Sequence, residues 1–452
     1  MPLRTLIIGG VAAGMSAASK LKRLRPNDDI VVLEKGCDVS YGACGMPYYL
    51  SGRIPDEHKL IARTKREFED AGIEVRLQHE VIDIDTEAKR VVALTQGERV
   101  GLCYDRLVIA TGASPIRLPV PGRELRGIHT LGSLEDARGL RRALQRSDVR
   151  HVAIVGGGYI GIEIAENVRE MGKEVTIIEA EERVLSTFAP FVSKAVNDTL
   201  LAHGVRVYLQ ETVSAYKGVD HVKQVISKQR SLNVDLVIEA VGIRPNTGFL
   251  DDAFDTVENG AIIVNETMQT SVTDVYAAGD CVAYPHKLTG TPAFVPLGTH
   301  ANKAGRVIAE HIAGLKSHFD GVIGATMLKA FNLEVARAGL NLDSANKANI
   351  TVHETHINAR DKSGYYPGAK PMDVAVYTDP KSGRLYGAEM VGEAGVALRI
   401  NTIATAIIAG MNADAFARAD LAYAPPFAPV YDPLQVACMQ VTTHPNKGGN
   451  DR

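Results

Sequence analysis

One of the five cysteines, Cys44, stands in a setting that could support redox chemistry. It lies in the segment SYGACGMPYY at residues 40–49, and no other cysteine occurs in the five positions after it. If a helix begins just after Cys44, its backbone dipoles lower the pKa of the thiol and favour the nucleophilic thiolate. Most cysteines are small buried apolar side chains, so residue type alone does not identify a reactive thiol. We interpret Cys44 as the candidate nucleophile because of its position.

Two glycine-rich segments have the spacing of dinucleotide-binding loops. Such a loop needs glycine where the chain turns, where the backbone approaches a pyrophosphate and where a helix packs on a strand. An acidic residue about 20 positions further on accepts hydrogen bonds from a ribose hydroxyl. The second copy meets every condition, with Gly156, Gly158, Gly161 and Glu179. The first copy has Val11 at the middle position but keeps Gly9, Gly14 and Glu34.

The acidic residue of the second loop bears on the choice of cofactor. A carboxylate at Glu179 favours a ribose 2′-hydroxyl and repels a 2′-phosphate. Glu181 and Glu182 add to that repulsion, although Arg183 lies close. The sequence therefore favours NADH over NADPH, with NADPH left open.

Apolar strands and helices surround these loops in a repeated strand–loop–helix–strand order. The predicted strands are residues 4–8, 30–33, 106–110, 152–155, 175–178, 236–240 and 275–277. Helices are predicted at residues 15–24 and from the second loop to about residue 171. From about residue 324 the pattern changes to strands at 374–378 and 385–390 and an apolar helix at 396–408, which we interpret as a third domain.

Composition narrows the classes of function. The 452 residues carry 50 Lys and Arg against 53 Asp and Glu, a net charge of −3, which gives no electrostatic reason to bind nucleic acid or an anionic membrane. The longest apolar run, residues 400–411, is too short to span a bilayer. Five scattered cysteines, an odd number, do not indicate a disulfide framework, so a reducing cytoplasm is expected. We interpret Cys103 and Cys281 as structural, and no metal site is expected.

The order of motifs resembles the single-cysteine branch of the pyridine nucleotide-disulfide oxidoreductase superfamily, closest to coenzyme A-disulfide reductase. The motifs that carry the resemblance are both glycine loops, the Cys44 segment, ATG at 110–112, VGIRPN at 241–246, AGD at 278–280 and NKAGR at 302–306. The resemblance implies an α/β fold with two Rossmann-like nucleotide-binding domains, for FAD and NAD, plus a C-terminal α+β dimerisation domain. The expected boundaries are 1–114 with 244–323 for FAD, 115–243 for NAD(P)H and 324–452 for dimerisation.

Cofactors, partner and site residues follow from the same resemblance. It implies FAD, NADH or NADPH, and coenzyme A as an additional ligand on Cys44. Contacts to FAD are expected from Gly9, Gly14, Glu34, Val81, Thr111, Gly112 and Asp280. Tyr159, in the second loop, resembles a gate that swings aside to admit the nicotinamide. The expected partner is a second copy of the chain.

The substrate side of the site is also implied by the resemblance. Two tyrosines, assigned to Tyr365 and Tyr423, are expected at the active site, one of them contributed across a dimer interface; Tyr366 is the weaker candidate. A phenol there can protonate or hydrogen-bond the departing thiolate. Ser40 and Asn302 match substrate contacts of the family. The phosphates of coenzyme A would need cations, for which Lys22 and Arg23 on the exposed face of the first helix are the candidates, although a solvated helix face would explain them equally. Packing at a dimer interface is the alternative explanation of these tyrosines.

The favoured function is FAD-dependent reduction of coenzyme A disulfide by NAD(P)H through Cys44. One alternative uses the same cysteine to reduce a persulfide, polysulfide or sulfur. NADH oxidases and peroxidases resemble one another in a histidine where this chain has Ala12, which argues against an oxidase. A flavin-bound redox sensor with little turnover is a further alternative. Ala43 departs from the asparagine that often precedes the cysteine in coenzyme A-disulfide reductases.

Overall fold

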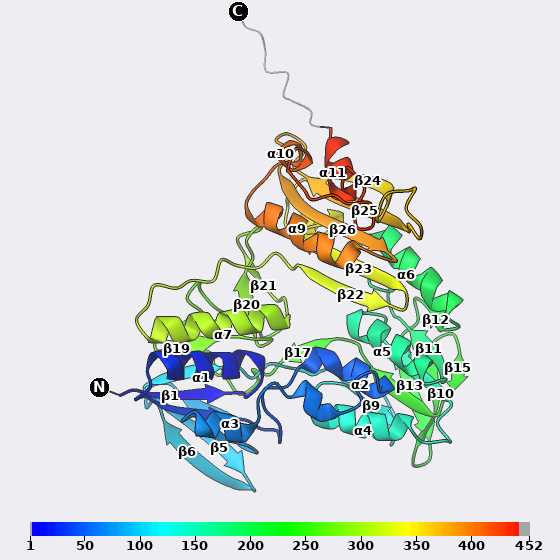
Figure 1. Cartoon of the computed structure of the whole chain (residues 1–452). Helices are drawn as coiled ribbons and strands as arrows, with labels where there is room; N and C mark the ends of the chain where they lie inside the picture. The colour runs from blue at the N-terminus through cyan, green and yellow to red at the C-terminus, as the bar shows by residue number, and fades with distance from the viewer. Residues whose placement is uncertain (1, 443–452) are drawn as a thin grey trace, which may run out of the picture.

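The first nucleotide-binding unit is a parallel sheet built from chain segments far apart in the sequence. A computed structural model describes residues 2–442. The strands of this sheet, in spatial order, are β19 (Val275–Ala277), β7 (Arg106–Ile109), β1 (Arg4–Ile8), β2 (Asp29–Leu33) and β3 (Glu74–Arg76). Nearly all their side chains are buried, as expected for a parallel sheet covered on both faces. Helices α1 (Ala12–Leu24) and α7 (Gly298–Ile312) pack together against it (Figure 1).

The second unit repeats this arrangement. Its sheet has the order β12 (Arg206–Tyr208), β11 (Glu174–Ile178), β10 (His151–Val155), β16 (Leu236–Glu239) and β9 (Ile128–His129). Three helices accompany it: α4 (Leu134–Leu144), α5 (Tyr159–Glu170) and α6 (Pro190–Ala202). β10 pairs in parallel with both β11 and β16, just as β1 pairs with β2 and β7. Each glycine loop therefore follows the central strand of its own sheet.

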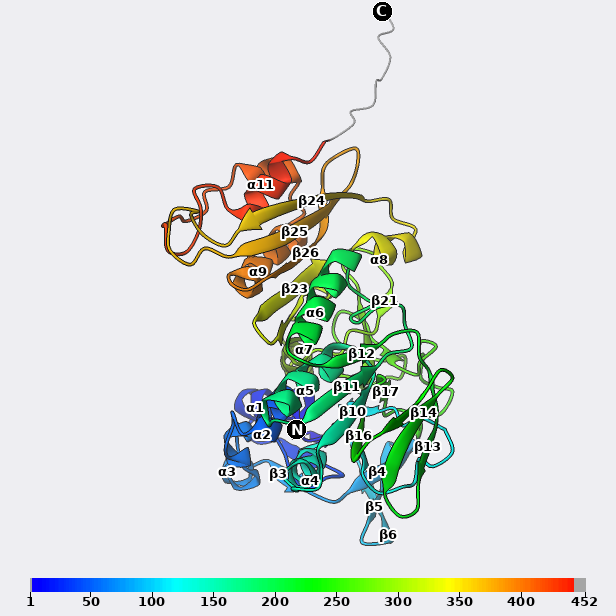
Figure 2. The ribbon, with the colours of Figure 1, turned by 90° about the vertical axis from the view of Figure 1, so that its right-hand side faces the viewer.

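The third unit is an antiparallel sheet with helices packed on it. The strand order is β22 (Thr326–Ala330), β23 (Leu333–Gly339), β26 (Leu385–Gly392), β25 (Pro371–Thr378) and β24 (His353–Arg360). The helices are α8 (Leu342–Lys347), α9 (Val396–Ile408), α10 (Ala413–Ala417) and α11 (Pro433–Met439). Figures 1 and 2 show this unit above the two nucleotide-binding units, with α6 reaching up to it.

Smaller elements complete the fold. Those in the active-site region are the short helix α2 (Met46–Ser51), α3 (Lys65–Asp70) and the 3-10 turns Ala43–Gly45 and Glu57–Leu60. The minor sheets comprise β4 (Glu80–Asp85), β5 (Arg90–Thr95), β6 (Glu98–Cys103), β13 (Val213–Gly218), β14 (Val222–Ser227), β15 (Ser231–Asn233), β8 (Ala113–Pro115), β17 (Ile243–Pro245), β18 (Ile262–Ile263), β20 (Val282–Pro285) and β21 (Pro292–Ala293).

The predicted elements agree closely with the structure. The strand at 4–8 and the helix at 396–408 are confirmed at both ends. The first helix begins at Ala12, three residues earlier than predicted, because Gly14 packs inside its first turn rather than in the loop. The mixed α/β fold with three units is confirmed. The domain boundaries stay a prediction, and residues 443–452 of the third lie outside the described chain.

One buried carboxylate joins the three units. Glu166 of α5 is 1% exposed and accepts hydrogen bonds from the backbone of Phe331 at 2.8 Å and from Lys329 in β22. Arg53, just past α2, pairs with the same carboxylate at 3.0 Å. Since a buried charge is costly unless it is paired, these contacts hold α2, α5 and β22 in one arrangement.

Candidate active site

A single cavity connects the two glycine loops and the Cys44 turn. Its volume is about 2250 Å³, and all three units contribute to its lining. Gly9 and Gly156 lie in it, as do Cys44, Asp280 and Arg337. A cavity between domains is a usual place for a ligand or cofactor site.

The first loop can only be built with glycine at two positions. Gly9 has a φ of +105°, and a Cβ there would lie 2.1 Å from the carbonyl oxygen of Ala110. A Cβ on Gly14 would lie 1.9 Å from the carbonyl oxygen of Gly9, so α1 approaches β1 closely. The carboxylate of Glu34 accepts hydrogen bonds from the backbone N–H groups of Gly10 and Gly36, each at 2.7 Å.

The second loop repeats this geometry. Gly156 has a φ of +106°, and a Cβ on Gly161 would lie 2.1 Å from the carbonyl oxygen of Gly156. Glu179 accepts hydrogen bonds from the N–H groups of Gly157 and Glu181. A Cβ on Gly158 would meet no protein atom within 4 Å, so the protein itself leaves room for a side chain at the place where the first loop has Val11. Both loops fit a dinucleotide.

Other predicted flavin contacts line the same cavity: Val81, Thr111, Gly112 and Asp280. The Thr111 hydroxyl donates to the carbonyl of Asn246 at 2.8 Å, and the Asn246 amide donates to the carbonyl of Thr111 at 2.9 Å. Burial raises the pKa of the Asp280 carboxyl above its ordinary value. These contacts hold the strand ends beside the first loop in place.

Cys44 lies exposed in the cavity, in the 3-10 turn Ala43–Gly45. The prediction that the following helix lowers the pKa of the Cys44 thiol is wrong. Although the side chain is open to the cavity, the protein around it removes part of its water. This desolvation, followed by the charges of Glu163 and Asp280, raises the pKa of the Cys44 thiol. The following helix, α2, has six residues and its N-cap is Gly45, so its dipole is weak and Cys44 stands outside it.

The other four cysteines are also free thiols. Cys281 is buried, as expected of a structural thiol, and so is Cys438. Cys103 is exposed at the end of β6, so its interpretation as a structural thiol is wrong. Cys37 is exposed beside Gln78, whose amide lies 3.7 Å from its sulfur.

Sequence reasoning missed a carboxylate close to Cys44. Glu163 lies one helical turn after Tyr159 and lines the cavity, where the hydroxyl of Tyr48 donates to it at 3.3 Å. Burial raises the pKa of Glu163 to about 7, opposed by the Tyr48 hydrogen bond and assisted by Glu166. The spacing of four from Tyr159 places both on one helix face and was the available signal.

Replacing Glu163 by Gln should make Cys44 more reactive. The neutral amide keeps the acceptor for Tyr48 but removes a negative charge that raises the pKa of Cys44. Alkylation of reduced Cys44 at pH 8, followed by peptide mass spectrometry, should be faster than in wild type. Below pH 7 the two proteins should converge, because Glu163 with a pKa of about 7 is then neutral in wild type as well. Equal rates at pH 8, or the same acceleration in a distant Glu174→Gln control, would contradict the assignment.

Three of the four residues predicted to contact coenzyme A line the cavity, and one does not. Arg23, Ser40 and Asn302 line the cavity, and Asn302 accepts a hydrogen bond from Ser16 at 2.6 Å. Lys22 lies outside the lining, and its ammonium donates to the carbonyl of Asp28 at 3.0 Å.

Tyr365 and Tyr423 lie together, away from the cavity of their own chain. Their hydroxyls are 3.0 Å apart, and the two side chains are 75% and 43% exposed. The hydrogen bond lowers the pKa of Tyr365 and raises that of Tyr423. The expectation that only one of them comes from a partner chain does not fit this geometry, because residues that share a hydrogen bond must arrive at any site together.

The two glycine loops and the exposed thiol line one cavity, an arrangement that fits an oxidoreductase. Residues 3–304 match the family described as pyridine nucleotide-disulphide oxidoreductase, and residues 326–433 match its dimerisation domain. The chain belongs to this family, which uses FAD and NAD(P)H. When bound, FAD would supply the hydride chemistry that links oxidation of NAD(P)H to reduction of a substrate.

Several characterised proteins and one solved structure are similar to this chain over most of its length. An NAD(P)H sulfur oxidoreductase (CoA-dependent) of Pyrococcus abyssi is 41% identical over 95% of this chain and 96% of its own. A coenzyme A disulfide reductase of Staphylococcus epidermidis is 30% identical over 94% and 96%. The structure of an NAD-dependent persulfide reductase from A. fulgidus has a TM-score of 0.93 and 35% identity, covering 97% of this chain and 82% of its own. Among residues 2–442, no helix has the length and apolar character needed to cross a membrane.

Proposed function

We propose that this protein reduces coenzyme A disulfide, or a mixed disulfide of coenzyme A, with NAD(P)H. The observation that carries the proposal is the exposed thiol of Cys44 in a cavity that both dinucleotide loops line. No other cysteine lies within six positions of Cys44 on either side, and Cys44 is a free thiol, so the sequence offers no CxxxxC pair of the kind that dithiol reductases use. The disulfide formed in turnover is then one with a small thiol.

The reaction follows from thiol–disulfide exchange. The Cys44 thiolate attacks one sulfur of the substrate disulfide, forming a mixed disulfide and releasing the first thiolate, which takes up a proton. Two electrons from NAD(P)H then break the mixed disulfide, which frees the second thiol and restores the Cys44 thiolate. Each turnover consumes one NAD(P)H, one proton and one disulfide, and yields NAD(P)⁺ and two thiols.

The two loops have different ligands in this proposal. FAD is held by the first loop through Gly9, Gly14 and Glu34, with Asp280 near its ribityl chain. NADH is held by the second loop, with Glu179 on the ribose. Arg183 is engaged by Asp343 at 3.2 Å and by the carbonyl of Ser186 at 3.3 Å. Because Arg183 already has these partners, it is not free to bind the 2′-phosphate of NADPH. The arrangement therefore supports NADH over NADPH.

The substrate contacts are fewer than expected from the sequence. Arg23 is the cation that we retain for the phosphates of coenzyme A, because it lines the cavity and Lys22 does not. Ser40 has a φ of +52°, and its N–H donates to the carbonyl of Gly10 at 2.8 Å, which holds it between the first loop and Cys44. Asn302 approaches from α7.

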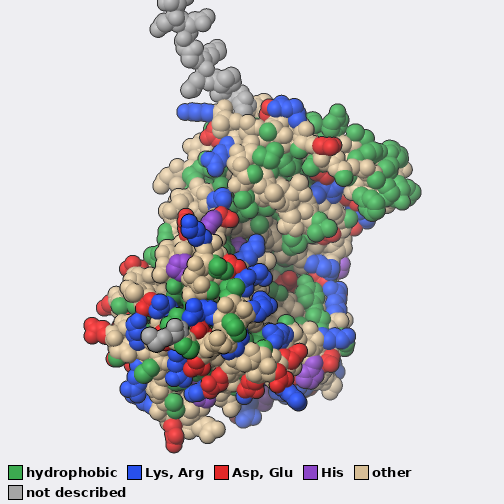
Figure 3. Space-filling model, turned by 60° about the vertical axis from the view of Figure 1, so that its left-hand side comes forward, with side chains coloured by type: hydrophobic (Ala, Val, Ile, Leu, Met, Phe, Trp, Pro, Cys, Tyr) green, Lys and Arg blue, Asp and Glu red, His purple; other side chains and the backbone are tan. Residues whose placement is uncertain are grey.

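A homodimer completes the proposal. Tyr365, Tyr423, Phe427, Val430 and Tyr431 of the C-terminal unit are exposed. Figure 3 shows hydrophobic side chains gathered at one projecting end of the molecule. Such a surface is typical of an interface between subunits. The two tyrosines of one chain then reach Cys44 of the other. The free thiols are consistent with a reducing cytoplasm as the compartment.

Reduction of a coenzyme A persulfide or polysulfide is the second candidate. The relatives described as a CoA-dependent sulfur oxidoreductase and a persulfide reductase favour it. The same thiolate attack serves both substrates. The products differ, because a disulfide yields two thiols and a persulfide yields one thiol and hydrogen sulfide.

The substrate test compares products and cofactors in one experiment. We expect anaerobic protein with NADH to release coenzyme A from its disulfide, with slower turnover on NADPH. A denatured-protein mass of the oxidised protein should show coenzyme A on Cys44. Hydrogen sulfide from coenzyme A persulfide, with no turnover of the disulfide and a persulfide mass on Cys44, would favour the second candidate. Flavin reduction without product from either substrate would contradict both and favour a redox sensor.

A further inference from the structure

The segment of residues 182–189, here the 182–189 loop, forms one wall of the second dinucleotide site. It joins the strand that ends before Glu179 to α6, and Ser186 and Thr187 line the cavity. Leu185 has a φ of +48°, and its N–H donates to the carbonyl of Gly157 at 2.9 Å. The loop therefore rests directly on the glycine loop that holds the nucleotide.

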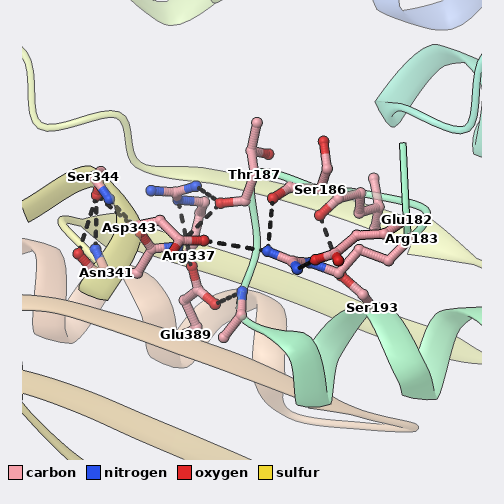
Figure 4. A network of polar contacts seen from close by, with 12 residues as sticks. Glu182, Arg183, Ser186, Thr187, Ser193, Arg337, Asn341, Asp343, Ser344 and Glu389 are labelled. Atoms are coloured by element: carbon pink, nitrogen blue, oxygen red, sulfur yellow. Dashed lines mark hydrogen bonds and ion pairs between the residues drawn. The ribbon is translucent and has the colours of Figure 1, made fainter. Parts of the chain in front are cut away.

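Side chains of the C-terminal unit hold the backbone of this loop. Glu389 of β26 accepts a hydrogen bond from the N–H of Ala189 at 2.6 Å. Asn341 donates to the carbonyl of Thr187 at 3.0 Å, and Arg337 of β23 donates to the same oxygen. Figure 4 shows the three side chains converging on the loop.

The three side chains also hold one another. Asn341 donates to the second carboxylate oxygen of Glu389 at 2.8 Å, and the Arg337 guanidinium lies 3.9 Å from the same oxygen. Glu389 is 1% exposed and Asn341 is 2% exposed. Buried polar groups that lose a partner carry the full cost of desolvation, so this cluster strongly favours one position of the loop.

The loop in turn supports Tyr159. The ring of Phe188 lies 5.6 Å from the ring of Tyr159, centroid to centroid, and the Arg337 guanidinium lies 5.5 Å from the Phe188 centroid. Burial raises the pKa of the Tyr159 phenol, while the Arg337 charge and a hydrogen bond with Thr187 oppose the rise. Tyr159 is therefore in contact with a wall whose position is determined by another unit.

We propose that Arg337, Asn341 and Glu389 are positioning residues of the nicotinamide site. They act through the backbone of Thr187 and Ala189 and the ring of Phe188 on Tyr159, so the packing of the C-terminal unit determines how well NADH binds. This inference rests on the assignment of the second loop to NADH, and it holds for either sulfur substrate. Loss of the contacts lets the 182–189 loop move and weakens NADH binding without affecting the thiol chemistry at Cys44.

The test measures NADH binding and loop protection in FAD-loaded protein. Arg337→Ala and Asn341→Ser remove donors to Thr187, and serine keeps the N-cap of α8 that Asn341 provides. We expect the Kd for NADH to rise about tenfold, the effect of losing one hydrogen bond to a charged or buried partner. Hydrogen exchange in the peptide covering residues 182–190 should accelerate, while exchange near the first loop and alkylation of Cys44 stay unchanged. Arg337→Lys should recover most of the affinity.

Glu393→Gln is the matched control, because Glu393 pairs with Lys370 at 2.9 Å on the same unit and makes no contact with the loop. It should behave as wild type. If Arg337→Ala loses FAD or melts at lower temperature, Asn341→Ser decides. Unchanged NADH affinity and loop exchange in Asn341→Ser, or equal losses in Glu393→Gln, would overturn the proposal. Wild-type protein that binds no NADH would instead overturn the assignment of the site.

Discussion

Cys44→Ser protein should retain its yellow flavin, be bleached by NADH under anaerobic conditions and release no thiol from coenzyme A disulfide. Serine keeps the size of the side chain but is a far weaker nucleophile at neutral pH, so exchange with the disulfide cannot begin. Disulfide turnover should fall by roughly 10⁴-fold or more, as when an enzyme loses its nucleophile. Stopped-flow absorbance and a thiol assay measure the two half-reactions separately.

Cys103→Ser provides the control for this result. Cys103 is an exposed thiol at the end of β6, outside the cavity lining, so its replacement should leave both half-reactions intact. Survival of disulfide turnover in Cys44→Ser protein would show that another thiol carries the reaction. Loss of flavin reduction together with disulfide turnover would show that the substitution damaged the site as a whole.

Disulfide turnover should fall by roughly 100-fold in Tyr365→Phe, in Tyr423→Phe and in the double variant, because one general acid usually contributes about this much. The effects should not add, because the two hydroxyls share one hydrogen bond at 3.0 Å and serve one proton transfer. Flavin reduction by NADH should be unchanged. Steady-state kinetics of the two single variants and the double variant measure this, and Tyr366→Phe is the matched control from the same exposed segment.

Mixed dimers test whether the tyrosines act on the other subunit. Inactive Cys44→Ser chains mixed with inactive Tyr365→Phe/Tyr423→Phe chains should recover about a quarter of wild-type activity, since half of the dimers are mixed and each has one complete site. Sites contained in one chain predict no recovery. Because both tyrosines lie on the same unit, either single variant should complement as well as the double variant.

Much of the nucleotide-binding architecture was available from the sequence. Gly9, Gly14, Gly156 and Gly161 act through backbone contacts within a strand, a turn and a helix, and such local geometry follows directly from residue type and spacing. The apolar helix at 396–408 was predictable for the same reason, since its pattern depends on its own residues.

The direction in which the pKa of Cys44 is shifted could not be predicted from the sequence. The sequence indicated a lowered pKa for Cys44 from the helix that follows, and the structure shows a raised one. The carboxylate of Glu163 comes from another nucleotide-binding unit, so its effect depends on how the units pack. Burial likewise depends on the whole cavity, and no local pattern reports it.

The sequence by itself thus predicted two dinucleotide-binding loops and one candidate reactive cysteine. Only the tertiary structure decided that Tyr365 and Tyr423 lie together outside the lining of the cavity that holds their own Cys44. It likewise decided that Arg337 and Glu389 hold the backbone of the 182–189 loop beside Tyr159. The physical reason is the distance along the sequence over which each kind of interaction acts. Turn geometry and helix periodicity extend over a few residues, whereas ion pairs and buried contacts join side chains whose separation is set by the packing of entire units.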